Sequence, residues 1–102
     1  MPKPKEPQSK DLLEDLCQDL TALDRPEDLQ AFLEDLCTPA ELKSISERWR
    51  VAKILETGDS YRSINESTGV STTTITRVAR AMTYGKQGYR LLLDKLKTEV
   101  AQ

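Results

Sequence analysis

The 102-residue sequence predicts an all-α protein of about six helices. Three observations carry this prediction. Apolar residues recur at three- and four-residue spacing along most of the chain, as they do on one face of a helix. Serine, threonine and proline stand where helices would begin, and glycine stands where several would end. No stretch alternates apolar and polar residues for long enough to predict a strand.

The first two helices are predicted from their apolar faces. Residues 1–8 hold three prolines and three charged residues, which predicts a disordered tail before a helix that Ser9 begins. A second helix should start after Asp24 as its N-cap, with Pro26 in the first turn and Glu27 completing a capping box. The apolar faces of the two helices comprise Leu12, Leu13, Leu16, Cys17, Leu20 and Leu23, then Leu29, Phe32, Leu33 and Leu36.

The third helix has the strongest start signal in the chain. Thr38 is a threonine N-cap, Pro39 occupies the first helical position, and Glu41 stands at the third. Gly58 is expected to end this helix as the residue beyond its C-cap. We expect Trp49, on its apolar stripe, to lie in the core or in a dimer interface. The other members of that stripe are Leu42, Ile45, Ala52 and Leu55.

Two short helices joined by a glycine turn predict a helix-turn-helix at about residues 60–82. Gly69 supplies the left-handed turn, and Ser71 caps the second helix. The glycines at 85 and 88 then break the chain, and we expect Tyr84 and Tyr89 to pack around the break. A last helix completes a helical domain over residues 9–98. The residues predicted to face inward in the motif are Ile64, Val70, Ile75, Val78 and Met82.

The second helix of this motif begins with four threonines within five residues. β-branched residues lower helix propensity, so an exposed run of them indicates another role. Threonine offers a hydroxyl to a phosphate or base edge and a methyl to the methyl of thymine. The alternative is a threonine-rich cap without a partner. The candidate DNA-binding residues on the two helices are Arg62, Asn65, Thr72, Thr73, Thr74 and Thr76.

The charge is divided between the two halves of the chain. Residues 1–40 carry four bases against ten acids, a net charge of −6, whereas residues 41–102 carry eleven against seven, a net +4. Between residues 60 and 90 there are five bases and one acid. Such a division is a hint of nucleic-acid binding, and a solvated helix face is the alternative. Together with the helix-turn-helix, it makes double-stranded DNA the partner that we expect.

Other classes of protein are disfavoured by the same sequence. Histidine is absent, which excludes catalysis or metal binding by histidine. We find no inward acid pair, no nucleophile beside a base and no metal-ligand spacing, so we expect neither an enzyme nor a metal site. No apolar run approaches the roughly 20 residues of a membrane span, and no signal peptide is recognised. We therefore expect a cytoplasmic protein whose Cys17 and Cys37 are reduced, small, buried apolar residues.

The run TPAELKSISERWRVAKILETGDSYRSINESTGVSTTTITRVARAM resembles the Trp repressor superfamily. The segments FLEDLCTP and YGxxGYR resemble its YerC/YecD branch, and the likeness spans residues 12–96. The resemblance implies an intertwined homodimer with one helix-turn-helix per subunit, in which the N-terminal helices and the last helix interlock. Such dimers place two recognition helices in successive major grooves of a pseudo-palindromic operator. The DNA-facing positions of the family fall on the six candidate residues named above.

The resemblance also implies a candidate effector pocket. The two arginines that sandwich the indole of tryptophan match Arg48 and Arg77, and a threonine of the family's pocket matches Thr38. However, Val78 stands where the family has a glycine that makes room for the ring, and Ala81 stands where it has a serine. We therefore expect that tryptophan is not the corepressor, and we expect no cofactor.

The sequence thus predicts a bacterial, sequence-specific DNA-binding transcriptional regulator that acts as a repressor. Two alternatives stay open. The first is a protein-interaction adaptor that keeps the fold and docks through its acidic N-terminal helices. The second is a regulator gated by an anion other than tryptophan at Arg48 and Arg77.

Overall fold

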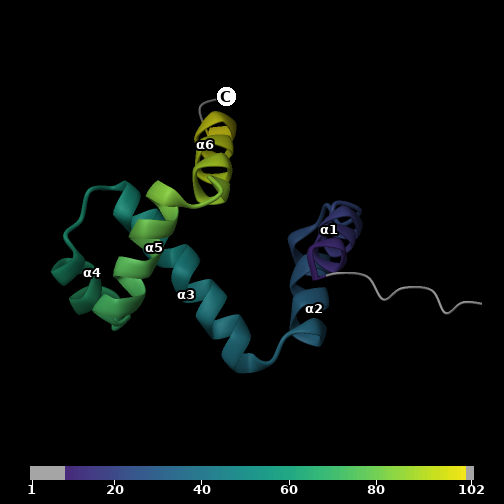
Figure 1. The fold of residues 1–102 in the computed structure, drawn as a ribbon, viewed down its shortest axis with the longest axis horizontal. Helices are drawn as coiled ribbons and strands as arrows, with labels where there is room; N and C mark the ends of the chain where they lie inside the picture. The colour runs from purple at the N-terminus through teal and green to yellow at the C-terminus, as the bar shows by residue number, and fades with distance from the viewer. Residues whose placement is uncertain (1–8, 101–102) are drawn as a thin grey trace, which may run out of the picture. The chain divides into compact units, whose positions relative to one another are not determined.

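The computed structural model describes residues 9–100, in which the chain forms six helices and no strand. The all-α prediction is therefore confirmed, whereas the predicted tail, residues 1–8, lies outside the described residues. The chain divides into two compact units, one ending at Pro39 and one beginning at Ala40. In order, the helices are α1 (Ser9–Leu20), α2 (Pro26–Leu36), α3 (Pro39–Glu56), α4 (Tyr61–Thr68), α5 (Thr72–Tyr84) and α6 (Gly88–Val100) (Figure 1).

The first unit contains α1 and α2, which are amphipathic but bury no residue. Leu12, Leu13 and Leu36 each leave more than half of their surface exposed. The same exposure overturns one prediction, because Cys17 on α1 is exposed rather than buried; Cys37 is half-buried, and both are free thiols.

The predicted cap of α2 is also wrong. The N-cap is Arg25 rather than Asp24, because the Arg25 carbonyl accepts the first helical hydrogen bond, from the Leu29 N–H at 3.1 Å. No side chain caps this helix, and Glu27 instead accepts a 3.2 Å hydrogen bond from Nε of Arg25.

The second unit is built on α3, which begins and ends where its sequence signals predict. It starts at Pro39, directly after Thr38, and its last helical residue is Glu56. Two residues later Gly58 adopts a φ of 86°, a left-handed conformation that glycine reaches without a steric penalty. The N–H of Gly58 donates to the Leu55 carbonyl at 3.1 Å, which satisfies one of the open carbonyls at the helix end.

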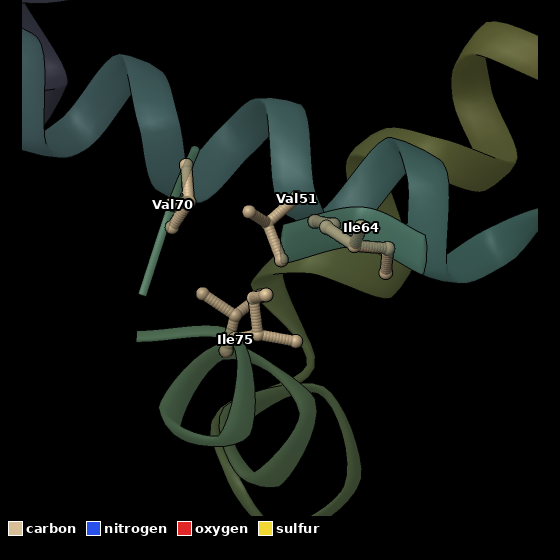
Figure 2. Packing of buried hydrophobic residues seen from close by; sticks show 6 residues of the cluster. Val51, Ile64, Val70 and Ile75 are labelled. Carbon is tan, nitrogen blue, oxygen red and sulfur yellow. The ribbon is translucent and has the colours of Figure 1, made fainter. Parts of the chain in front are cut away.

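The core of this unit joins α3, α4 and α5. Figure 2 shows Val51 of α3 directed toward Ile75 of α5, with Ile64 of α4 and Val70 of the turn beside it. None of these four side chains is more than 4% exposed, and Ala52 and Val78 complete the cluster. Burying one such side chain stabilises a fold by about 1.5–3 kcal/mol, so the cluster holds the three helices together. The inward residues predicted for the motif are confirmed, with Met82 half-buried at the edge.

The last helix is attached to α3 by a stacked aromatic pair and a cluster of charged side chains. Trp49 stacks on Tyr89 with the ring centroids 6.3 Å apart and the planes 8° from parallel. At the end of α3, Glu56 accepts hydrogen bonds from both terminal guanidinium nitrogens of Arg90, Nη1 and Nη2, and, at 3.0 Å, from Nζ of Lys97. The hydrogen bonds from Arg90 and then Lys97 lower the pKa of Glu56 to about 2. The sequence analysis missed this cluster.

The break between α5 and α6 is shaped by two unusual residues. A Cβ at Gly85 would lie 2.4 Å from the carbonyl oxygen of Ala81, so no other residue fits this backbone without a shift. Gln87 has a φ of 65°, which is left-handed and strained for a residue with a side chain. Tyr89 packs against the core as expected, but Tyr84 is 80% exposed and does not. Its ring lies instead 6.0 Å from the guanidinium of Arg80, which is also on the surface.

Candidate nucleic-acid interface

Helices α4 and α5 form a helix-turn-helix unit whose ends are fixed by local hydrogen bonds. Oγ of Ser60 accepts the N–H of Ser63 at 3.1 Å and caps α4. Oγ of Ser71 accepts the N–H of Thr74 at 3.2 Å and caps α5. Between them Gly69 takes a φ of 76°, which a residue with a Cβ adopts only at a cost. The sequence signals for these caps and this turn are confirmed.

Two side chains of α4 hydrogen-bond to the backbone of Val70, the residue that follows Gly69 in the turn. Nδ2 of Asn65 donates to the carbonyl of Val70 at 2.8 Å. Oγ1 of Thr68 accepts the N–H of the same residue at 3.1 Å and donates to the Ile64 carbonyl at 2.6 Å. Because Val70 is itself buried in the core, these bonds fix where α5 begins relative to α4. The structure thus places Asn65, a predicted DNA-binding residue, half-buried on α4 with its side chain bonded to the turn.

The four threonines of α5 do not share one environment. Thr72, Thr73 and Thr76 are exposed. Thr74 is half-buried, and its hydroxyl oxygen accepts a 3.1 Å hydrogen bond from Oγ of Ser71. The exposed face at the start of α5 therefore presents three short hydroxyl side chains, and we call Thr72, Thr73 and Thr76 the threonine face.

Arg62 lies on the exposed surface of α4. Its Nε donates to Oε1 of Glu66 at 3.1 Å, one helical turn further along. The side chains of the pair are 89% and 64% exposed, and ion pairs of such exposure are weak because water screens both charges. The guanidinium of Arg62 therefore stays accessible to a negatively charged partner.

Of the candidate effector-pocket residues, Arg48 lies on α3 and Arg77 on α5 of the second unit, whereas Thr38 belongs to the first unit. Thr38 is exposed just before α3, and Nε of Arg48 donates to the Ser44 carbonyl at 3.4 Å. Arg77 is exposed on α5. Val78 is only 1% exposed and belongs to the core cluster, so its side chain is packed among other side chains.

Two hollows of the second unit are lined in part by α3. The smaller, of about 200 Å³, is lined by Ala40, Lys43, Ser44, Glu47 and Thr74. The larger, of about 370 Å³, is lined by Trp49, Ala81, Gly85, Lys86, Gly88, Tyr89 and Leu92. Neither is lined by Arg48 or Arg77. Within the described residues, no three metal-ligating side chains are grouped together, and no helix is long and apolar enough to cross a membrane.

Known proteins resemble this chain over most of its length. The family model for the Trp repressor protein matches residues 11–97. The protein YerC of Bacillus subtilis, described as uncharacterised, is 39% identical over 85 residues, which are 83% of this chain and 82% of that protein. A TrpR-like protein of Eubacterium eligens has a solved structure that matches with a TM-score of 0.79 and 40% identity, covering 84% of this chain and 89% of that one. A candidate Trp repressor of Staphylococcus aureus matches with a TM-score of 0.79 and 36% identity, over 84% and 86% of the two chains.

Proposed function

The chain belongs to the Trp repressor family, and from this premise we propose that it is a sequence-specific, DNA-binding transcriptional repressor. Two copies read a pseudo-palindromic operator, each with α5 as its recognition helix in one of two successive major grooves. A regulator of this kind acts in the bacterial cytoplasm, and it has no enzymatic activity. The observation that carries the proposal is the threonine face at the exposed start of α5.

The threonine face has the properties that a base-reading surface needs. Its side chains are short, so the helix backbone can approach the base edges closely, and each offers both a hydroxyl and a methyl. The helix that carries them contains no acidic residue to repel phosphates. Ile75 and Val78 anchor the opposite side of the same helix in the core, which gives the face a fixed orientation.

A second copy of the chain explains the apolar surface that one copy leaves open. Helices α1 and α2 bury no residue, although each has an apolar face. Leu91 and Leu92 of α6 are also 63% and 46% exposed. Large exposed apolar surfaces mark interfaces between proteins. We therefore assign these three helices to the dimer interface, which sets the spacing between the two recognition helices.

The repressor that we propose does not use tryptophan as its corepressor. Val78 is buried in the core where the family glycine makes room for an indole ring, and Ala81 offers no hydroxyl. A thermal-shift titration checks this point. The melting temperature should stay constant up to millimolar L-tryptophan, and a rise at sub-millimolar concentration would contradict it.

Fluorescence anisotropy with two DNA duplexes tests the proposed function. One duplex is the chain's own upstream sequence and the other is a scrambled version of it. The wild type should prefer the upstream duplex at least tenfold, which corresponds to about 1.4 kcal/mol. Changing Thr73 and Thr76 together to alanine should abolish the preference, whereas Ser46→Ala, which removes an exposed hydroxyl from α3, should leave it intact. Binding to neither duplex would refute the proposal and favour a protein-interaction adaptor.

A further inference from the structure

The exposed surface of α5 continues beyond the threonine face. Residues three, four and seven positions apart lie on one side of a helix, so Thr73 and Thr76 are in line with Arg77, Arg80 and Tyr84. All five side chains are exposed. The inward side of the same helix is occupied by the buried core residues. The recognition helix therefore presents one continuous strip, polar at its start and basic in its middle.

The two arginines of this strip differ from most other arginines of the chain. Arg25, Arg62 and Arg90 each form an ion pair with a nearby carboxylate. Among the residues that the structure describes, neither Arg77 nor Arg80 forms an ion pair. Helix α5 has no acidic residue of its own that could provide one. The strip therefore holds two positive charges that no neighbouring carboxylate compensates.

The Arg80 guanidinium also lies over an aromatic ring. Its guanidinium carbon lies 6.0 Å from the centroid of the Tyr84 ring, within the range of a cation–π interaction. Tyr84 is itself 80% exposed and is not part of the core cluster. This contact keeps the Arg80 guanidinium along the helix while it remains open to a partner.

The spacing along α5 matches the depth of the major groove of DNA. At 1.5 Å per residue, Arg80 lies about 10 Å along the helix axis from Thr73. The major groove is about 8.5 Å deep. If α5 enters the groove by its start, so that the threonine face meets base edges, a group about 10 Å further along the helix lies at the level of the phosphate backbone. Arg77, about 6 Å from Thr73, lies between the two.

We infer that Arg77 and Arg80 form a phosphate-binding surface on the recognition helix, directed at the DNA backbone beside the bases that the threonine face reads. This inference rests on the proposed function, and it adds the division of labour along α5. The threonine face selects sequence, and the arginines supply sequence-independent affinity. It also gives Arg77 a role that needs no effector.

The salt dependence of DNA binding tests this inference. The dissociation constants of wild type, Arg77→Gln and Arg80→Gln are measured with the upstream and the scrambled duplex from about 50 to 200 mM KCl. Each lost phosphate contact lowers the slope of log K against log salt by about 0.9, hence by about 1.8 in a dimer. Over that fourfold range each contact accounts for a factor of about 3.5, so the wild-type dimer should lose about 12-fold more affinity than either variant does. Both duplexes should be affected equally.

Two variants serve as controls. Arg50→Gln removes the same charge from an exposed position on α3, about 200° around that helix from the buried Ala52, and should behave as the wild type. Arg80→Lys keeps the charge and should keep the slope. Because Arg77 and Arg80 are exposed, the circular-dichroism melting curves of all variants should coincide.

The outcomes separate this inference from the proposed function. Wild-type slopes in both glutamine variants, with the tenfold sequence preference intact, would refute the phosphate-binding surface alone. A loss confined to the upstream duplex would also refute it, because the arginines would then read bases. A flattened slope without any sequence preference in the wild type would support the surface and refute sequence reading. Binding to neither duplex at 50 mM KCl would refute both.

Discussion

Asn65 offers the sharpest contrast between a predicted and an observed role. The sequence assigned this residue to the DNA surface, but its side chain donates a 2.8 Å hydrogen bond to the carbonyl of the buried Val70. Replacing it by alanine removes the bond and leaves that carbonyl without its side-chain donor. A hydrogen bond contributes about 0.5–1.5 kcal/mol, and an unsatisfied buried group costs about 1–3 kcal/mol. Because Asn65 is only half-buried and water can replace part of the bond, we expect Asn65→Ala to lower the free energy of unfolding by about 1–2 kcal/mol.

Thermal unfolding measures this loss directly. For a chain of this size, 1 kcal/mol shifts the melting temperature by about 4–8 °C. Wild type and variants must be compared at one protein concentration, because a dimer melts at a concentration-dependent temperature. Ser63→Ala is the matched control, since it removes an exposed hydroxyl from the same helix and should change stability by less than about 0.5 kcal/mol. An Asn65→Ala protein that melts with the wild type but binds DNA more weakly would refute the turn-clamping role.

Three further predictions concern two glycines, the charged cluster around Glu56 and the strained backbone at Gln87. Gly69→Ala should cost about 1 kcal/mol, because φ is 76° but the space around the new Cβ is open. Gly85→Ala should cost more, about 2–3 kcal/mol, because its Cβ would meet the Ala81 carbonyl oxygen at 2.4 Å. Urea unfolding in which Gly85→Ala loses less stability than Gly69→Ala would contradict this. The pKa of Glu56 falls from 4.5 to about 2 on folding, so its contribution is complete above pH 4.5 and disappears as the pH falls toward 2. Glu56→Gln should therefore lose less stability than the wild type across that interval, and parallel pH profiles would argue against the cluster. Gln87→Gly should relieve the strain at φ 65° and raise stability by about 0.5–1 kcal/mol, which a lowered melting temperature would disprove.

The parts of the fold that the sequence predicts are those with local causes. The caps at Ser60 and Ser71 and the turn at Gly69 depend on neighbours within three or four residues. The burial of Ile64 and Ile75 follows from helical spacing. Each of these features could therefore be predicted from the sequence alone.

The parts that the sequence does not predict depend on contacts between distant or differently oriented groups. Glu56 meets Arg90 and Lys97 across 34 and 41 residues, and nothing local indicates that pairing. The role of Asn65 depends on where the Val70 carbonyl points after the turn has formed. An asparagine five residues before a buried valine is too weak a pattern to predict that bond.

Within the candidate site, the residue types were predicted better than their environments. The run of threonines was found from its cost in helix propensity, but its division into three exposed side chains and the half-buried Thr74 required the structure. That Arg77 and Arg80 lack an acidic partner, unlike Arg25, Arg62 and Arg90, follows only from the ion pairs that the described part of the structure contains.

The central claim is that α5 of a dimer reads a DNA sequence, and selection from a library of randomised duplexes tests it most directly. Wild-type protein should enrich an inverted repeat whose half-sites are centred about one helical turn apart, roughly 10 base pairs. The variant with Thr72, Thr73 and Thr76 changed to alanine should fold as the wild type but enrich no such repeat. Enrichment of the same repeat by that variant, or of none by the wild type, would contradict the claim.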